Sequence, residues 1–273
     1  NVISRRLSFK RSAVADLSTR SPFLVQAETL GEAWILAVKE VLSHGTSVMT
    51  EYQESSLDLP GSLWVRAPLK EPRIHLVAYG SWPEAAAKYA KEVLEGVGNS
   101  RATEGDRYTY HQRLFHYGSN SEDGGFDQVE WMASRLGEAG HTRRAQATTW
   151  FPIHVLHEAE DGGMTLGDNL RQYPPCLQRV WCRMVNERLE MHSHWRSRDI
   201  WKAMPLNMLA LTDLQKKIAT HLGVEVGPYM DTSDSLHVYE RDLEEARSAL
   251  KKLRARGGLV QTPPWRLKPP KTD

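Results

Sequence analysis

A thiol, a guanidinium and a hydroxyl are brought into register by one predicted hairpin. Two strand-like apolar runs lie within residues 177–195, and the polar pair Asn186–Glu187 separates them, which is typical of a β-hairpin. If the turn is centred on that pair, residues whose numbers add up to about 373 lie opposite each other. Cys176 then lies across from Arg196 and Ser197, at the open end of the hairpin.

This arrangement suits a nucleophilic cysteine. Cysteine attacks as its thiolate, and a nearby guanidinium lowers the thiol pKa because it favours the charged form. Cys176 beside Arg196 meets that need. Cys176 could instead be a small buried hydrophobe at the start of a strand. It could also be one half of a papain-like Cys–His pair, although no signature of that family surrounds it.

The same region contains one candidate metal site, formed by two cysteines and two histidines: Cys176, Cys182, His192 and His194. Their spacing matches no common zinc pattern. The two histidines alternate with apolar residues, as they would on a solvated strand face. We therefore expect no metal.

Helices and further strands must position these groups. The apolar spacing predicts helices over residues 29–44, 83–94, 129–136, 206–222 and 242–256. The first begins with a capping box, Thr29 with Glu32. We expect two strands within 62–78 and one within 144–155. Residues 97–125 are rich in Gly, Ser, Asp and Glu, so we expect there a loop of the kind that often lines sites.

Composition excludes several classes of partner. Lys and Arg number 35 against 34 Asp and Glu, so no global charge attracts nucleic acid or a membrane surface. No apolar stretch reaches the roughly 20 residues that span a bilayer, and no signal peptide is visible. The two cysteines, six residues apart on one predicted strand, are poor disulfide partners. Free thiols suit a reducing compartment, so we expect a cytoplasmic protein that binds neither nucleic acid nor membranes.

One compact domain accounts for most of the 273 residues. Residues 1–27 show no clear period and are expected to form a loosely packed arm. Residues 28–258 are expected to form the catalytic domain. The proline-rich residues 259–273 are expected to form an extended tail.

Four motifs in order and with near-family spacing resemble the thymidylate synthase superfamily: Tyr173-Pro-Pro-Cys176, Arg196-Ser197-Arg198-Asp199, Pro205-Leu206-Asn207 and Asp234-Ser-Leu-His237-Val-Tyr239. Three upstream segments resemble the family's dimer-crossing double arginine and elements of its shorter archaeal-type members: Thr142-Arg143-Arg144, Tyr108-Thr-Tyr110 and Phe126-Asp-Gln128. The resemblance covers about residues 105–242. It implies an α/β fold with a large mixed β-sheet flanked by helices, and a homodimer formed by sheet-to-sheet packing with sites shared across the interface.

The resemblance also implies a covalent mechanism and a phosphate site. Cys176 would add to C6 of a pyrimidine nucleoside 5′-monophosphate, so that C5 attacks the methylene carbon of 5,10-methylenetetrahydrofolate. Arg196 and Ser197, with Arg143 and Arg144 of the partner subunit, would hold the phosphate. The alternative for each arginine is a solvated surface charge.

Further roles follow from the same resemblance. Asn207 would read the base edge, Asp199 would orient the base and the folate, and Tyr110 would help proton movement near C5. His237 and Tyr239 lie at i and i+2 of a predicted strand, so both point to one face, where they would bind the sugar hydroxyl. Asn207 could instead cap a helix. The other side chains could fill a strand face or the core.

The sequence departs from the family's pattern in several places. The early loop at 51–54 lacks the family's phosphate-binding arginine. Aligning the helix at 83–94 on Gly96 puts Tyr89 where the catalytic glutamate belongs, and Glu92 is the candidate for that role. Three substitutions lie near the site: Ala203 replaces a usual glycine, Leu177 a histidine and Trp195 a glutamine. The family's C-terminal closing segment is not recognisable in 267–273.

Two reactions are compatible with these motifs. One is methylation of dUMP to dTMP. The other is hydroxymethylation of a uridylate or cytidylate, favoured by the altered folate side because water could capture the exocyclic methylene. Asn207 favours uracil, since its amide can donate to O4 and accept from N3–H. A catalytically silent nucleotide-binding homologue is the alternative, although such a protein would have no chemical need for a thiol beside Arg196.

Overall fold

An eight-stranded mixed sheet forms the centre of the protein in the computed structural model, which describes residues 21–75, 82–99, 108–118, 124–152 and 167–255. The strand order is β1-β3-β8-β6-β5-β4, with β2 paired to β3 and β7 to β8. The strands are β1 (Phe23–Ala27), β2 (Thr46–Met49), β3 (Ser55–Val65), β4 (Gln146–Thr148), β5 (Leu177–Val185), β6 (Arg188–Trp195), β7 (Arg198–Asp199) and β8 (Glu225–Tyr239). The predicted large mixed sheet is therefore present.

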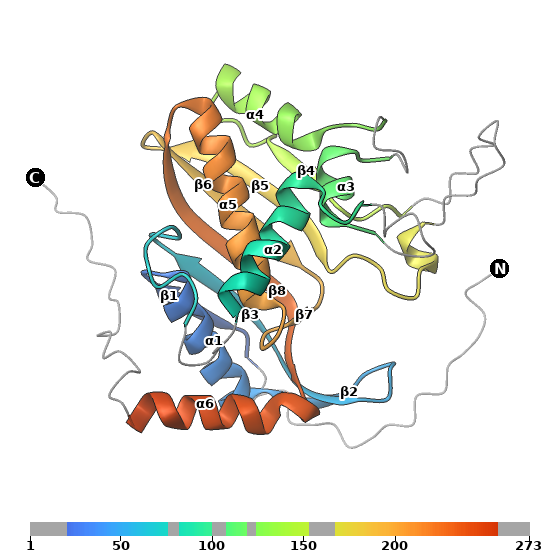
Figure 1. Ribbon diagram of the computed structural model, residues 1–273, viewed down its shortest axis with the longest axis vertical. Helices are drawn as coiled ribbons and strands as arrows, with labels where there is room; N and C mark the ends of the chain where they lie inside the picture. Colours follow the sequence, from blue (N-terminus) through green and yellow to red (C-terminus); the bar gives the residue numbers. More distant parts are fainter. Residues whose placement is uncertain (1–20, 76–81, 100–107, 119–123, 153–166, 256–273) are drawn as a thin grey trace, which may run out of the picture.

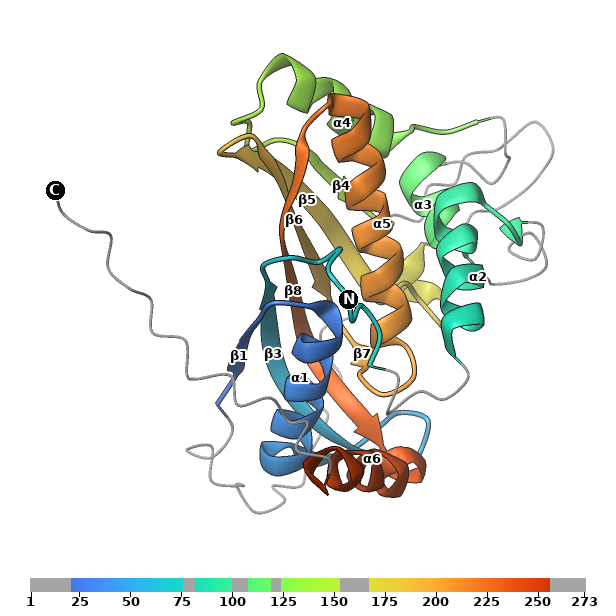
Figure 2. The ribbon, with the colours of Figure 1, turned by 60° about the vertical axis from the view of Figure 1, so that its left-hand side comes forward.

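The helices gather on one side of this sheet (Figures 1 and 2). They are α1 (Leu30–His44), α2 (Trp82–Glu95), α3 (Tyr110–Phe115), α4 (Gln128–Glu138), α5 (Met204–Leu222) and α6 (Leu243–Ala255). Buried residues alternate with half-buried ones along β6 and through most of β8. This period of two is expected when only one face of a sheet is covered by helices. The core therefore lies between the sheet and the helices.

The hairpin of β5 and β6 has the predicted register, with one irregularity. Asn186 and Glu187 both have positive φ, 50° and 59°, as a two-residue hairpin turn requires. The predicted pairing holds from the turn out to Arg179, which lies opposite His194. A shift between residues 177 and 179 then moves the pairing by one. As a result the Arg196 backbone N–H donates to the Cys176 carbonyl at 2.9 Å.

Several predicted element boundaries agree with the structure. The Thr29 hydroxyl accepts from the Glu32 backbone N–H at 3.3 Å, and Gly45 follows the last residue of α1. Gly223, with φ 69°, ends α5 in the left-handed conformation that favours glycine. All five predicted helices are present.

Other predictions were wrong in detail. Residues 23–27, assigned to the arm, form β1, which pairs in parallel with β3. Of the two strands expected within 62–78, one is the end of β3, which begins earlier, at residue 55, whereas the described residues 66–75 form no strand. The strand expected within 144–155 is only β4. The short helix α3 lies inside the segment expected to be loop. Residues 1–20 of the arm and the tail, residues 259–273, lie outside the described residues.

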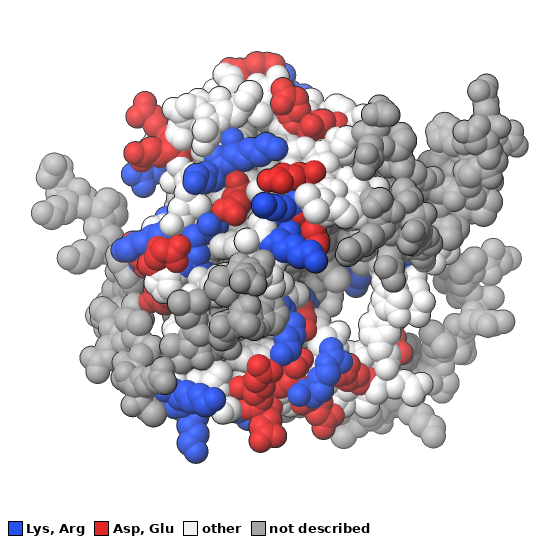
Figure 3. Space-filling view, in the orientation of Figure 1, with Lys and Arg blue, Asp and Glu red and all other residues white. Residues whose placement is uncertain are grey.

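Acidic and basic side chains are interspersed over the face of the molecule seen in Figure 3. This mixed pattern fits the near-equal numbers of acidic and basic residues in the chain. Within the residues that the structure describes, every helix is too short or too polar to cross a membrane.

A buried ion pair joins the centre of the sheet to α5. The Arg198 guanidinium donates to the Asp231 carboxylate, and both side chains are almost fully buried, at 1% and 0% exposure. Arg198 also donates to the Met204 carbonyl at 3.2 Å, and Asp231 accepts from Tyr229 and Ser193. Removing one member of such a pair leaves the other charge buried and uncompensated, which costs about 3–5 kcal/mol.

We expect Asp231→Asn to lower the free energy of unfolding by about 3–5 kcal/mol, because Arg198 loses its counter-charge in the core. Asp234→Asn is the matched control on the same strand. Its carboxylate pairs with His194 at the surface, and removing it should change stability by less than about 1 kcal/mol. Urea unfolding of both variants measures the difference. Equal stability of the two would contradict the importance of the buried pair.

Candidate functional site

A cavity of about 820 Å³ opens where β6, β7 and β8 meet the start of α5. Eight of the predicted site residues line it: Tyr110, Cys176, Arg196, Ser197, Asp199, Asn207, His237 and Tyr239. They come from segments far apart in the sequence, which the sheet and α5 bring together. The volume lies within the range of about 300–1,000 Å³ that is usual for small-molecule sites.

Three predicted site residues lie outside this cavity wall. Glu92 is on α2, one turn after Tyr89, and it is Tyr89 that lines the cavity. Arg143 and Arg144 are exposed in the connection between α4 and β4. Aligning the helix on Gly96 pointed to Tyr89. The choice between Tyr89 and Glu92 depends on which face of α2 packs towards the cavity, and the sequence alone does not give that.

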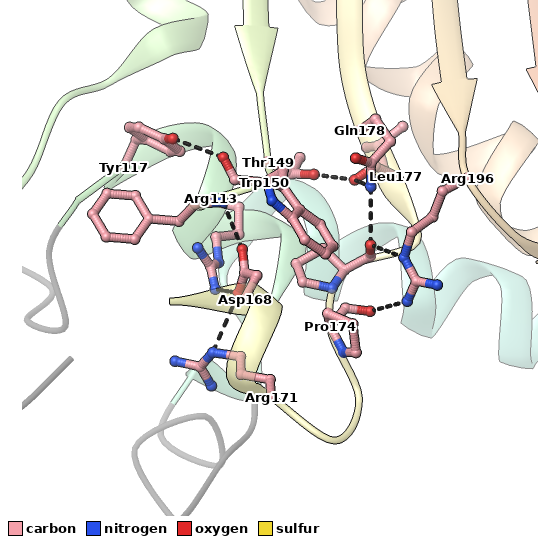
Figure 4. A network of polar contacts seen from close by, with 12 residues as sticks. Arg113, Tyr117, Thr149, Trp150, Asp168, Arg171, Pro174, Leu177, Gln178 and Arg196 are labelled. Atoms are coloured by element: carbon pink, nitrogen blue, oxygen red, sulfur yellow. Dashed lines mark hydrogen bonds and ion pairs between the residues drawn. The ribbon is translucent and has the colours of Figure 1, made fainter. Parts of the chain in front are cut away.

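Arg196 holds the loop that carries the thiol. Its Nε donates to the Pro175 carbonyl at 2.9 Å and its Nη2 to the Pro174 carbonyl at 2.7 Å (Figure 4). The same Nη2 lies 3.9 Å from Cys176 Sγ. Cys176 is half-buried beside the cavity, whereas Cys182 is fully buried on β5. The predicted proximity of the thiol and the guanidinium is confirmed.

The pKa of the Cys176 thiol is not lowered, contrary to the expectation from the neighbouring arginine. Burial raises the pKa of Cys176, and the nearby guanidinium groups of Arg196 and Arg198 only partly oppose that effect. The net shift is upward from the ordinary value. The expected lowering by Arg196 is therefore outweighed by desolvation. In the free protein at neutral pH the thiol is mostly protonated.

Two tyrosines pack around the thiol. The Tyr110 hydroxyl accepts from the Leu177 backbone N–H at 3.1 Å, next to Cys176 in the chain. The Tyr108 and Tyr110 rings meet edge to face with centroids 5.5 Å apart. Burial raises the pKa of both phenols. Both therefore stay neutral at physiological pH and can act as hydrogen-bond donors.

His237 and Tyr239 point to the same side of β8, as predicted. Their rings meet edge to face at 4.8 Å, and both line the cavity. Burial lowers the pKa of His237, although the carboxylates of Asp199 and Asp58 oppose this shift. The imidazole is therefore neutral at pH 7. Asp199 accepts from the Trp201 and Lys202 backbone N–H groups at 2.8 and 2.9 Å.

A buried carboxylate behind the thiol loop was missed by sequence reasoning. Asp168 accepts from Arg113 Nη2 at 2.6 Å and from the Phe151 backbone N–H at 2.6 Å, and its Oδ1 lies 3.2 Å from Arg171 Nε (Figure 4). It thus connects α3, the segment after β4 and the loop that leads to Cys176. No periodicity links these positions in the sequence, so no local signal could have found them.

An aromatic pair at the cavity was also missed. The Tyr52 and Tyr173 rings are stacked with centroids 5.8 Å apart, and each side chain is about half exposed. Both line the cavity. Tyr52 belongs to the early loop where the sequence lacks a phosphate-binding arginine.

The residues that the structure describes contain no cluster of three or more His, Cys, Asp or Glu able to hold a metal ion. His192 packs against the Trp181 ring with centroids 4.8 Å apart on the uncovered face of the sheet. Cys182 lies in the core. The four side chains considered for zinc are therefore divided between different environments.

Comparison with known proteins matches residues 68–262 to the thymidylate synthase family. A Methanopyrus kandleri protein is 31% identical over 82% of this chain and 96% of its own length. Proteins of Methanocaldococcus jannaschii and Methanosarcina mazei are each 27% identical, over 81% and 84% of this chain and 92% and 94% of their own lengths. All three are provisionally named thymidylate synthase. The matched range includes every predicted site residue, and the chain belongs to the thymidylate synthase family.

Proposed function

We propose that this protein transfers a one-carbon group to C5 of a pyrimidine nucleoside 5′-monophosphate through a covalent bond between Cys176 and C6 of the base. The observation that supports this most is the cavity in which Cys176 Sγ lies 3.9 Å from Arg196 Nη2. Asn207 and His237 line the same cavity. A nucleophile, a cation and neutral hydrogen-bonding groups thus surround one space.

Covalent activation accounts for the need for a thiol. The Cys176 thiolate forms the S–C6 bond, and the electron pair of the C5=C6 bond moves onto C5 and O4 of the base. C5 becomes nucleophilic, which an unmodified pyrimidine is not. C5 would bond to the methylene carbon of the folate as one of that carbon's C–N bonds breaks. Loss of the C5 proton and breakage of the second C–N bond would then leave an exocyclic methylene on the base. That methylene would take a hydride from tetrahydrofolate, which leaves as dihydrofolate, or a hydroxide from water, and expulsion of the thiolate from C6 would restore the C5=C6 bond. The phenol of Tyr110, close to the thiol, is suited to guide the proton movement.

The cations of the site suit a phosphate. Two of the Arg196 nitrogens donate to the carbonyls of Pro174 and Pro175, so its orientation is set before a ligand binds. Its remaining N–H groups and the Ser197 hydroxyl are available to a phosphate at the cavity wall. Arg143 and Arg144 of the partner subunit would complete this site.

The uncovered face of the sheet supports a homodimer. Trp64 and Trp181 both contact His192 on this face, with ring centroids 6.2 and 4.8 Å apart. The indole N–H of Trp181 donates to the Arg143 carbonyl at 3.0 Å. The exposed double arginine therefore lies next to the face that would meet a second copy. Sheet-to-sheet packing would bury these aromatic side chains.

The cavity fits a reduced folate beside the nucleotide. Apolar wall is supplied by Ala203 and Leu206, next to the carboxylate of Asp199, and a flat pterin ring needs such a surface with a polar group at its edge. 5,10-Methylenetetrahydrofolate would supply the one-carbon electrophile when bound. Asp199 would orient its ring. Access of water to the cavity would then decide between methylation and hydroxymethylation.

A catalytically silent nucleotide-binding homologue is the second candidate. The raised pKa of Cys176 and the absence of Glu92 from the cavity wall favour it. Release of tritium from C5-labelled dUMP, UMP, dCMP and CMP, with product identified by mass, separates the candidates. A silent homologue releases none. A product heavier by a methyl or a hydroxymethyl group identifies the reaction.

We expect Cys176→Ser to abolish turnover while nucleotide binding persists, because the thiolate forms the bond to C6 whereas the phosphate and base contacts lie elsewhere. Tritium release measures turnover and calorimetry measures binding. Cys182→Ser is the matched control, since that side chain is buried away from the cavity, and it should keep nearly full activity. Substantial turnover by the Cys176 variant would exclude the covalent mechanism.

The reactivity of Cys176 should depend on pH in a defined direction. The net effect of its surroundings raises the thiol pKa. The pH at which alkylation by iodoacetamide reaches half its maximal rate should therefore lie above the ordinary cysteine pKa of about 8.5. Arg196→Gln keeps amide donors but removes the charge, so it should move that midpoint higher still. Cys182→Ser should leave the curve unchanged. A midpoint that falls in the Arg196 variant would contradict the electrostatic role.

We expect complementation between subunits. If each site combines Cys176 of one subunit with Arg144 of the other, an Arg144→Ala chain and a Cys176→Ser chain form mixed dimers with one intact site of two. Equal mixing should therefore restore about a quarter of the normal activity. Either variant alone should be nearly inactive. Full activity from a monomer in dilute solution would contradict shared sites.

A further inference from the structure

Tyr89 and Asn207 form a direct contact inside the cavity. Asn207 lies in the first turn of α5 and is buried, with 6% exposure. Its Nδ2 donates to the hydroxyl oxygen of Tyr89 on α2 at 2.7 Å. Both side chains line the cavity that contains Cys176. A residue that was not predicted to belong to the site therefore holds the amide proposed to read the base.

The contact fixes which groups are left for a ligand. Burial raises the pKa of Tyr89, so the phenol is neutral and keeps its hydrogen. Its oxygen already accepts from Asn207, and among the described residues no acceptor is assigned to its O–H. One of the two Nδ2 hydrogens is used by Tyr89, and Oδ1 is the acceptor that the amide can offer to the cavity. The pair can thus offer one acceptor, Oδ1 of Asn207, and two donors, the Tyr89 hydroxyl and the second N–H of Asn207.

We propose that Tyr89 positions Asn207 and donates its hydroxyl hydrogen to O4 of a uracil base. This inference rests on the proposed function, because it takes Asn207 as the reader of the base. Oδ1 of Asn207 then accepts from N3–H while Tyr89 donates to O4. Two adjacent groups of the pyrimidine are matched by two side chains from different helices.

The same hydrogen bond would assist the chemical step. When the thiolate of Cys176 forms the S–C6 bond, the displaced electron pair places negative charge on O4. A donor already aimed at O4 stabilises that charge, and no proton has to leave Tyr89. Loss of one such donor in other enzymes lowers kcat by about 10²–10³-fold. Tyr89 would then act both on binding and on rate.

Cytosine would be mismatched at both positions. Its N3 is an acceptor and would face Oδ1 of Asn207, and its 4-amino group is a donor and would face the hydroxyl hydrogen of Tyr89. Each unpaired polar group in a buried site lowers affinity by about one to two decades. The pair therefore predicts a preference for uridylates over cytidylates.

Tyr89→Phe tests the proposal, because it removes the hydroxyl and keeps the ring. We expect kcat with dUMP or UMP to fall about 10²-fold, with a smaller change in KM. The ratio of uridylate to cytidylate turnover should also fall at least about tenfold. Tyr229→Phe is the matched control. It removes a buried hydroxyl that bonds to Ser193 and Asp231 outside the cavity wall, and it should lower Tm without changing that ratio.

A second variant keeps the test decisive if the first fails to fold. In Asn207→Asp the carboxylate accepts a hydrogen bond from the Tyr89 hydroxyl, so the O–H of Tyr89 points away from the cavity and cannot donate to O4. The base preference of the protein should therefore move from uridylate towards cytidylate. Unchanged kcat and unchanged base preference in Tyr89→Phe would overturn the proposal. So would an unmodified protein that already prefers cytidylates.

Binding separates this inference from the proposed function. Calorimetry with UMP and CMP in the Cys176→Ser background needs no turnover. If the unmodified protein releases no tritium but Tyr89→Phe still loses its preference for UMP, the proposed reaction fails and the role of Tyr89 in base reading stands. If tritium is released normally and Tyr89→Phe retains both its rate and its preference, the reaction stands and the inference fails.

Discussion

The ion pair between Arg198 and Asp231 is the constraint on which the rest of the site depends. It lies in the core, where the strands β6, β7 and β8 meet α5, and its members are almost completely removed from water. Arg198 lines the cavity together with its neighbours Ser197 and Asp199. The charge pair therefore ties the segment that follows β6 to β8 and to the first residue of α5.

Desolvation gives the cavity its chemical character. Burial raises the pKa of Cys176, Tyr89 and Tyr110 and lowers that of His237. All four side chains are therefore mainly neutral at pH 7. Arg196 keeps a full positive charge. This combination suits a ligand with a neutral base to be read by hydrogen bonds and an anionic phosphate to be held by cations. Under the proposed function, the thiolate would form within the bound complex, where the base can take up its electron pair.

Local signals were enough for much of the fold, and tertiary contacts account for the differences. The turn at Asn186–Glu187 and the alternation around it predicted the hairpin that brings Cys176 to Arg196. The shift between residues 177 and 179 was not predictable, because it depends on packing. Residues 23–27 carry no clear period, and they become a strand because an edge of β3 is available to pair with them.

The sequence by itself determined the motifs, their order along the chain, most helix limits and the family resemblance, since these depend on neighbours close in the chain. Only the tertiary structure decided that Tyr89 lines the cavity while Glu92, one turn away, does not, because that depends on how α2 packs against α5. It also decided that Asp168 supports the thiol loop, through partners distant in sequence. The same holds for the pKa of Cys176. A neighbouring arginine can be read from the sequence, but the desolvation that outweighs it is produced by residues that only folding brings together.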